Sequence, residues 1–250
     1  MIHRAAAEGF ARSAGAYERG RPGYPEAAVR FLVSPLRPGC GVLDLAAGTG
    51  KLTRPLLAAG LQVVAVEPVA QMRAAIPDEA RVLEGTAEAI PLEDGSVDAV
   101  VVGQAFHWFD GDAALAEIHR VLRPGGTLAL LWNRRVEDDA VNRAVEELIG
   151  PYRAGAPTHR GDAWRAAFDR AAVFDAVDER EFANSQRLDA EGLEARVGSI
   201  SFIAALATRE RAGVLERARA IAGAGTVVVR YRTQVQLWRA LGHRVSSPSA

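Results

Sequence analysis

Two acidic residues lie close to a glycine-containing loop in the first third of the chain. Asp44 is inside the apolar segment VLDL, and Glu67 closes the apolar segment VVAVE. Gly48 and Gly50 lie between them, in the sequence AAGTGKL. Small residues that follow an apolar segment let a ligand approach the backbone closely. The stretch therefore predicts a binding cradle for a pyrophosphate, a nucleoside triphosphate or a ligand without phosphate.

The residues around the loop distinguish between these ligands. A nucleoside triphosphate loop places Ser or Thr directly after its lysine, whereas Lys51 is followed by Leu52. The dinucleotide fingerprint G-x-G-x-x-G is nearer, but its third position holds Thr53. Asp44 would repel a pyrophosphate and attract an ammonium group. The loop therefore favours a ligand that carries a positively charged amino group.

Glu67 indicates a second part of the same ligand. It lies 17 positions after Gly50, at the end of the next apolar segment. A carboxylate at that point can accept hydrogen bonds from both hydroxyl groups of a ribose. Dinucleotide-dependent enzymes use the same acid, so Glu67 identifies a ribose without identifying the class of enzyme.

The elements that must position these residues alternate regularly in the first half. Fully apolar strands alternating with helices predict a parallel sheet that is covered on both faces, an α/β doubly wound fold. The expected strands are 41–46, 62–67, 81–84, 97–103 and 127–132. The expected helices are 26–36, 51–59, 69–75 and 112–122, with a turn at 123–126.

The second half has a weaker pattern. Helices are expected at 138–149, 164–172, 190–197 and 209–222, and strands at 174–182 and 226–236. The two late strands have no long crossover between them and suggest an antiparallel addition at one edge of the sheet.

Composition limits the class of protein. A chain of 250 residues with 49% hydrophobic residues can bury a full core, and its net charge of −1 is spread without a basic or acidic block. We therefore expect a small-molecule ligand, no nucleic-acid partner and no membrane partner. Cys40 is the only cysteine, so no internal disulfide and no metal site are expected. Neither a signal peptide nor a long apolar segment is visible, which predicts a cytoplasmic protein.

Four segments in order carry a family resemblance: VLDLAAGTGKLT, VVAVEPVAQM, GTAEAIPLEDGSVDAVVVGQAFHWF and EIHRVLRPGGTLALLWN. They resemble the successive motifs of class I S-adenosylmethionine-dependent methyltransferases, and more narrowly the methyltransferase type 11 group with its trans-aconitate methyltransferase-like proteins. The resemblance covers residues 10 to 135, and TVVVRYRTQVQLWRA is similar to the family's final strand. It implies a Rossmann-like, doubly wound, seven-stranded and mostly parallel sheet with an antiparallel last strand.

The resemblance implies S-adenosyl-L-methionine as the cofactor. Asp44 is then expected near the amino group, and Glu67 on the ribose hydroxyls. Thr86 occupies a position where the family often has Asp, so the backbone amide of Ala87 is the preferred contact to the adenine. Further implied cofactor contacts are Tyr17, Arg21, Ala46, Gly48, Thr49, Gly50, Pro68, Met72, Glu88, Gln104 and Ala105.

The implied roles of these residues follow the parts of the cofactor. Pro68 and Met72 are expected to pack on the adenine, and Gln104 and Ala105 to border the methionine end. The segment YERGRPGYP resembles a part that closes over the cofactor, with Arg21 on its carboxylate. A proline-stiffened lead-in is an equally good interpretation of that segment.

His107 and Trp108 are the expected acceptor-binding residues, against the alternative that AFHWF is only a hydrophobic staple. His107 is also the candidate general base for a phenol, amine or carbon acceptor, because the imidazole pKa lies near working pH. A carboxylate acceptor needs no base. The favoured activity is methyl transfer to the carboxylate or hydroxyl of a small molecule. The alternatives are an NAD-dependent oxidoreductase and a non-catalytic module that binds the cofactor.

The expected organisation is a single domain, present as a monomer or a homodimer. Residues 1–36 form a lid, 37–135 the cofactor-binding core and 136–225 a variable acceptor-pocket region with a late strand. Residues 226–245 hold the final antiparallel strand, and 246–250 are a disordered tail.

Overall fold

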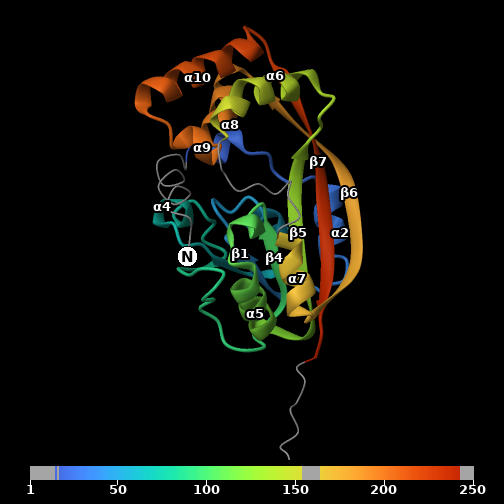
Figure 1. The fold of residues 1–250 in the computed structure, drawn as a ribbon. Helices are drawn as coiled ribbons and strands as arrows, with labels where there is room; N and C mark the ends of the chain where they lie inside the picture. The colour runs from blue at the N-terminus through green and yellow to red at the C-terminus, as the bar shows by residue number, and fades with distance from the viewer. Residues whose placement is uncertain (1–14, 16, 154–163, 243–250) are drawn as a thin grey trace, which may run out of the picture.

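The structure is a computed structural model that describes residues 15, 17–153 and 164–242. Within these residues the strands form one seven-stranded sheet in the order β3-β2-β1-β4-β5-β7-β6 (Figure 1). β1 to β5 are parallel to one another, and β7 is antiparallel to both β5 and β6. The strands are β1 (Gly41–Leu45), β2 (Gln62–Val66), β3 (Arg81–Leu83), β4 (Val97–Gly103), β5 (Leu122–Arg135), β6 (Phe174–Leu188) and β7 (Val227–Ala240).

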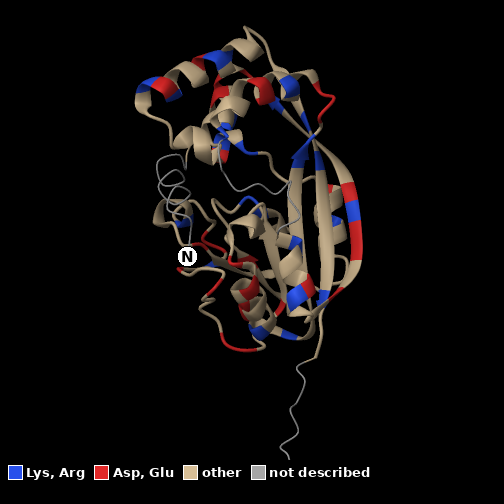
Figure 2. Ribbon diagram, in the orientation of Figure 1, with Lys and Arg blue, Asp and Glu red and all other residues tan. Residues whose placement is uncertain are grey.

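Helices cover both faces of this sheet and one of its ends. The described α-helices are α2 (Glu26–Val33), α3 (Thr53–Ala58), α4 (Ala70–Arg73), α5 (Gly111–Val121), α6 (Ala140–Ile149), α7 (Arg165–Ala171), α8 (Ala190–Gly198), α9 (Ser201–Ala204) and α10 (Thr208–Ala222). Two 3-10 helices, η1 (Phe106–Trp108) and η2 (Gly150–Tyr152), complete the described elements. In Figure 2 acidic and basic positions are interspersed along α10 and β6, as the balanced composition implies.

Alternation along β1 explains how the first half is built. Leu43 and Leu45 pack in the cluster that contains α5, whereas Val42 packs in the opposite cluster with α2 and α3. Asp44 belongs to the same face as Val42, because alternate residues of a strand point to the same side. Its neighbours in register are Ala65 of β2 and Val101 of β4. The sheet therefore places a buried carboxyl group next to the carboxyl end of an inner strand.

The four helices α6, α8, α9 and α10 form a cap at one end of the long strands (Figure 1). They share a hydrophobic cluster with the ends of β6 and β7, in which Val197 and Val214 meet Leu188 and Tyr231. α7 is separate from the cap, since it packs on α5 in the core cluster. The region 136–225 thus divides between the cap, the core and a long edge strand.

The expected doubly wound sheet with a reversed last strand is confirmed, and several boundaries need correction. The expected turn at 123–126 lies inside β5, where the pairing with β4 shifts register and Gly125 has φ 75°. β6 continues beyond 182 to Leu188, because its exposed residues alternate and leave no continuous apolar signal. η1 and η2 were not expected. Residues 1–14 of the predicted lid and the tail at 246–250 lie outside the described residues.

None of the described helices is long and apolar enough to cross a bilayer.

Residues 17–25 connect the core to the cap. Gly20 lies directly on α8, where a Cβ atom on Gly20 would overlap backbone atoms of Ala195 and Arg196. Glu18 accepts hydrogen bonds from Thr49 Oγ1 and Lys51 Nζ, through its carboxylate and its carbonyl oxygen respectively. The segment is therefore held on one side by the glycine-containing loop and on the other by a cap helix.

Replacing Gly20 with Ala tests this packing. We expect Gly20→Ala to lower the free energy of unfolding by roughly 1–3 kcal/mol, because neither backbone can yield to the added methyl group. Urea denaturation measures the change. Gly23→Ala is the matched control, since a Cβ atom on Gly23 has nothing within 4 Å. Equal stability of the two variants would contradict the close contact with α8.

Candidate functional site

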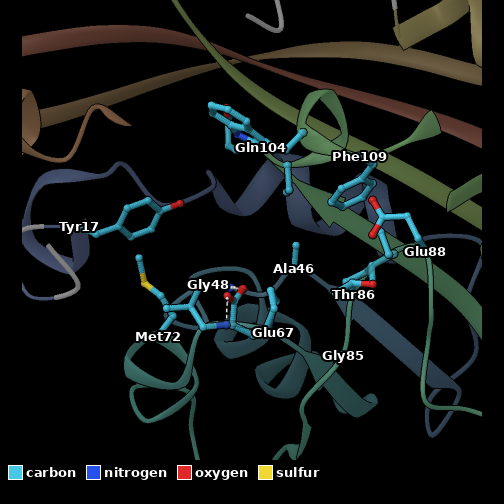
Figure 3. Close-up of a pocket in the computed structure, with 17 residues that line it drawn as sticks. Tyr17, Ala46, Gly48, Glu67, Met72, Gly85, Thr86, Glu88, Gln104 and Phe109 are labelled. Atoms are coloured by element: carbon cyan, nitrogen blue, oxygen red, sulfur yellow. Dashed lines mark hydrogen bonds between the residues drawn. The ribbon is translucent and has the colours of Figure 1, made fainter. Parts of the chain in front are cut away.

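A cavity lies at the carboxyl ends of β1, β2 and β4, and we call it the main cavity (Figure 3). In Figure 3 Tyr17 reaches in from one side, Met72 and Glu67 lie below, and Gln104 lies above. This is where a doubly wound sheet binds its ligands, because the loops after neighbouring parallel strands meet there. Its lining is Tyr17, Leu45, Ala46, Gly48, Glu67, Pro68, Val69, Met72, Gly85, Thr86, Ala87, Glu88, Gly103, Gln104, Ala105, Trp108 and Phe109.

The loop after β1 has an unusual backbone. Ala46, Gly48 and Gly50 have φ values of 58°, 59° and 79°. This left-handed region costs little for glycine and is strained for alanine, and such strain concentrates at functional sites. Ala46 and Gly48 line the main cavity.

Gly50 serves the packing of the loop. A Cβ atom on Gly50 would lie 2.9 Å from Pro77 Cδ and 3.3 Å from Ile76 Cα. Gly50 is absent from the described lining of the main cavity. This close contact with the segment after α4 is a separate reason for glycine at this position, and the role of Gly50 as a cofactor contact stays a prediction.

Glu67 joins the loop to the end of β2. Its Oε2 accepts a hydrogen bond from the Gly48 amide and its Oε1 accepts one from the Val69 amide, both at 2.9 Å. The side chain is buried, and burial raises the pKa of the Glu67 carboxyl while the two amides lower it. Figure 3 shows the bond to Gly48 at the floor of the main cavity. Each oxygen keeps a lone pair for a ligand hydroxyl group.

Asp44 is the second buried acid of the site. It is 1% exposed, and its Oδ2 accepts a hydrogen bond from Thr53 Oγ1 at 2.6 Å. Burial raises the pKa of Asp44 to about 7, against the lowering effect of Thr53. Thr53 occupies the position where the dinucleotide fingerprint requires glycine. Its hydroxyl group is therefore a specific partner of Asp44.

Asp44 lines a second cavity, which we call the inner cavity. The two cavities share Tyr17, Ala46, Gly103 and Gln104 in their linings. The other residues that line the inner cavity are Arg21, Pro22, Tyr24, Asp44, Ala47, Lys51, Leu52, Asn133 and Arg196. Tyr17 and Gln104 thus stand between a space that contains Glu67 and a space that contains Asp44.

Gln104 has two features typical of a functional position. Its φ is 61°, a strained value for a residue with a side chain. Its Nε2 is buried and has no hydrogen-bond partner among the described residues. An unpaired buried amide costs free energy, which a ligand acceptor atom would recover.

The residues expected around the adenine lie on the opposite walls of the main cavity. Pro68 and Met72 come from the segment that follows β2, and Thr86 and Ala87 from the segment that follows β3. Glu88 also lines the cavity, and its Oε1 accepts a hydrogen bond from the Asp110 amide at 3.1 Å. Glu88 therefore also ties this wall to the start of α5.

His107 and Trp108, the two residues expected to bind the acceptor, both belong to η1 but have different surroundings. Ala105 and Trp108 line the main cavity. His107 belongs to neither described lining, and its ring centroid lies 4.9 Å from that of Trp108 and 5.6 Å from that of Trp132. The turn of η1 brings the His107 ring against Trp132, and the acceptor-binding role of His107 stays a prediction.

The N-terminal segment completes the site. Tyr17 lines both cavities, and Arg21 lines the inner cavity. Arg21 Cζ lies 5.3 Å from the Tyr17 ring centroid, and its Nη2 donates to Ser199 O at 2.8 Å. Thr49 is 1% exposed and holds this segment through Glu18 without lining either described cavity.

Sequence reasoning missed several lining residues. Val69, Gly85 and Phe109 are immediate neighbours of predicted residues, and the quoted motifs already contained them. Lys51 is the only lysine of the sequence, and its Nζ donates a hydrogen bond to Glu18 O at 2.7 Å. Arg196 had no local signal, because only the contact between α8 and the N-terminal segment brings it to the site.

The residues present fit S-adenosyl-L-methionine. Asp44 suits an ammonium group, and Glu67 suits a pair of ribose hydroxyls. Gln104 offers an unpaired donor where the two cavities meet. Phosphate is disfavoured, because both acids are buried beside the loop.

Comparison with known proteins identifies related sequences. Residues 43–130 match the type 11 family described as "Methyltransferase domain". An uncharacterized methyltransferase of Mycobacterium tuberculosis is 52% identical over 147 residues, 56% of this chain and 58% of that protein. A malonyl-[acyl-carrier protein] O-methyltransferase of Pectobacterium atrosepticum is 37% identical over 154 residues, 60% of this chain and 61% of that protein. The matched region thus spans less than two thirds of either relative.

Two further comparisons extend over most of the chain. A candidate type II methyltransferase structure from Anaeromyxobacter dehalogenans has a TM-score of 0.66 and 27% identity, covering 89% of this chain and 99% of that one. An uncharacterized methyltransferase-like protein of Schizosaccharomyces pombe is 36% identical over 205 residues, 78% of each chain. Together with the strand order, these matches show that the chain belongs to the class I S-adenosylmethionine-dependent methyltransferases.

Proposed function

We propose that the protein transfers a methyl group from S-adenosyl-L-methionine to a carboxylate or hydroxyl group of a small molecule. The observation that carries this proposal is the pair of buried acids, Asp44 and Glu67, at the ends of two adjacent parallel strands. Together they suit a ligand that has an ammonium group and a ribose but no phosphate. The family membership supports the same cofactor.

The lining residues divide between the parts of this cofactor. Glu67 would hold the ribose hydroxyls and Asp44 the amino group, with Arg21 on the carboxylate. Pro68 and Met72 would enclose the adenine together with Thr86, Ala87 and Glu88. Tyr17, Ala46, Gly48, Gln104 and Ala105 would surround the methionine end, and Trp108 would border the acceptor.

The chain's contribution to the reaction is alignment in a dry space. When bound, S-adenosyl-L-methionine supplies an activated methyl group for in-line displacement. Tyr17 and Gln104 stand between the two cavities, where they can exclude water and orient an acceptor. A carboxylate acceptor needs no base, which suits the packing of His107 on Trp132. The relative from Pectobacterium atrosepticum, a malonyl-[acyl-carrier protein] O-methyltransferase, supports an oxygen acceptor.

The remaining sequence predictions belong to this proposal. The lid at 1–36, the acceptor region at 136–225, the cytoplasmic location, the monomer or homodimer and the lack of nucleic-acid partners stay predictions. Membership of the trans-aconitate methyltransferase-like group also stays a prediction. His107 is retained as a general base only for a phenol, amine or carbon acceptor.

A ligand comparison tests the proposed function against its alternatives. We expect S-adenosylhomocysteine, and not NAD, to raise the melting temperature, because ligands that bind the folded state stabilise it. Stabilisation by NAD alone would support an oxidoreductase. Incubation with radiolabelled S-adenosyl-L-methionine and a panel of carboxylates, phenols and amines then measures transfer. Binding without transfer to any acceptor of a broad panel would support the non-catalytic module.

Glu67→Gln tests the ribose contact. We expect it to weaken S-adenosylhomocysteine binding by roughly 10- to 100-fold, because the amide replaces one acceptor oxygen with a donor. Isothermal titration calorimetry measures the dissociation constant. Glu84→Gln is the matched control, since Glu84 ends the neighbouring strand region, is exposed and pairs with Arg73 outside the main cavity. Similar affinities for both variants would remove Glu67 from the site.

The raised pKa of Asp44 predicts a pH dependence of binding. The folded pKa of about 7 exceeds the ordinary value of 3.8, so the stability contribution of the neutral carboxyl is present below about pH 4 and lost as pH rises through about 7. An ammonium ligand requires the charged carboxylate instead. We therefore expect S-adenosylhomocysteine affinity to rise with pH, by up to about tenfold per pH unit below 7, and to level off above it.

Asp44→Asn isolates this effect from the titration of Glu67, whose pKa is also raised by burial. The amide retains an acceptor oxygen for Thr53 Oγ1. We expect the variant to bind weakly and with a nearly flat profile when calorimetry is repeated between about pH 5.5 and 8.5. A profile as steep as that of the unchanged protein would show that another group titrates.

A further inference from the structure

Two arginines line the inner cavity, and the proposed cofactor contacts involve only one of them. Arg21 comes from the N-terminal segment and Arg196 from α8 of the cap. Neither forms an ion pair with an acidic residue of the described chain. Arg196 is buried and Arg21 is half-buried, and two neighbouring cations in such surroundings are costly unless a counterion compensates them.

Arg196 is held in place and retains an unused donor. It is 8% exposed, and its Nε donates to Tyr231 Oη at 3.0 Å. Its Nη1 is buried and has no partner among the described residues. Tyr231 Oη in turn donates to Gln186 Oε1 at 3.3 Å, so the tyrosine is fixed as well. The guanidinium group is therefore preorganised to bind an anion.

Arg21 is anchored in a similar way. Its Nη2 donates to Ser199 O at 2.8 Å, while its Nε is buried without a partner in the described chain. Burial, followed by the nearby charge of Arg196, lowers the pKa of Arg21 to about 10. The two cations therefore repel each other across the inner cavity.

The charges of the protein with its proposed cofactor leave an excess of positive charge in the inner cavity. The proposed function gives the cofactor's ammonium group to Asp44 and its carboxylate to Arg21. Arg196 then keeps an uncompensated positive charge, and the cofactor's sulfonium adds another. An anionic acceptor would balance both, and a planar carboxylate matches the donor geometry of a guanidinium group.

We propose that Arg196 binds a carboxylate group of the methyl acceptor, so that the substrate is a carboxylic acid held between the cap and the cofactor. This proposal rests on the proposed function for the position of the cofactor. It assigns the cap a direct role in substrate choice, through a residue that α8 carries to the inner cavity. Tyr231 is the positioning residue that orients Arg196.

The test measures carboxylate binding to the full chain that is saturated with S-adenosylhomocysteine. The probes are malonate, succinate, glutarate and inorganic phosphate, titrated by calorimetry. We expect at least one dicarboxylate to bind, and Arg196→Gln to weaken it by about tenfold or more. The affinity for S-adenosylhomocysteine should change by less than about twofold, because Arg196 does not serve the cofactor.

Two further variants separate charge from folding. Arg187→Gln is the matched control, because Arg187 is exposed on β6 and outside the inner cavity, and it should leave carboxylate binding unchanged. Tyr231→Phe keeps the ring and the charge of Arg196 but removes the Oη acceptor, and it should weaken carboxylate binding by a smaller factor. Circular dichroism checks each fold, and Tyr231→Phe decides the outcome if Arg196→Gln does not fold.

Four results would overturn the proposal. The first is that no dicarboxylate binds to the loaded protein, and the second is that phosphate binds in their place. The third is that Arg196→Gln weakens S-adenosylhomocysteine but not 5′-methylthioadenosine, which would assign Arg196 to the cofactor's carboxylate. The fourth is unchanged carboxylate binding in Arg196→Gln, or in Tyr231→Phe if only that variant folds. Failure of the proposed function is distinguishable, because the unchanged protein would then bind no S-adenosylhomocysteine.

Discussion

The carboxylate of Glu67 is the interaction on which the site depends. Its two oxygens accept hydrogen bonds from the backbone amides of Gly48 and Val69, each with an N–O distance of 2.9 Å. These bonds hold the loop after β1 against the end of β2. Without the Glu67 carboxylate, both amides would lose their hydrogen-bond acceptor at the floor of the main cavity. The strained backbone at Ala46 persists because the surrounding contacts determine it. A single buried acid thus shapes the loop and offers its remaining lone pairs to a ligand.

The second constraint is charge that is buried without full compensation. Asp44, Arg21 and Arg196 line the inner cavity, and Gln104 adds an unpaired amide nitrogen beside them. Such groups lower the stability of the protein on its own, and a ligand of complementary charge would return that free energy on binding. The N-terminal segment and α8 pack closely beside these groups, and Arg21 Nη2 donates a hydrogen bond to Ser199 O at the end of α8. Gly20 permits that approach, because it has no side chain between the two backbones.

Much of the core could be predicted from local pattern. The alternation of apolar strands and helices located β1 to β4 to within one or two residues, because buried parallel strands are continuously apolar. Asp44, Gly48 and Glu67 were also found from their types and spacing. The extent of β6 was not, because the polar alternation of its second half resembles a loop until β7 is seen to pair with it. The packing of His107 against Trp132 was not predicted, because the motif does not reveal the direction of a turn in η1.

The sequence by itself determined the doubly wound sheet and the position of the loop after β1, and it predicted a ligand that has an amino group and a ribose. These properties follow from residues that are close together in the chain or at the ends of consecutive strands. Only the tertiary structure decided that Thr53 is the partner of Asp44, that Gly50 faces Ile76 and Pro77, and that Arg196 joins the site. Each of these depends on contacts between elements that are distant in sequence, and hydrophobic periodicity carries no information about which side chains will meet there.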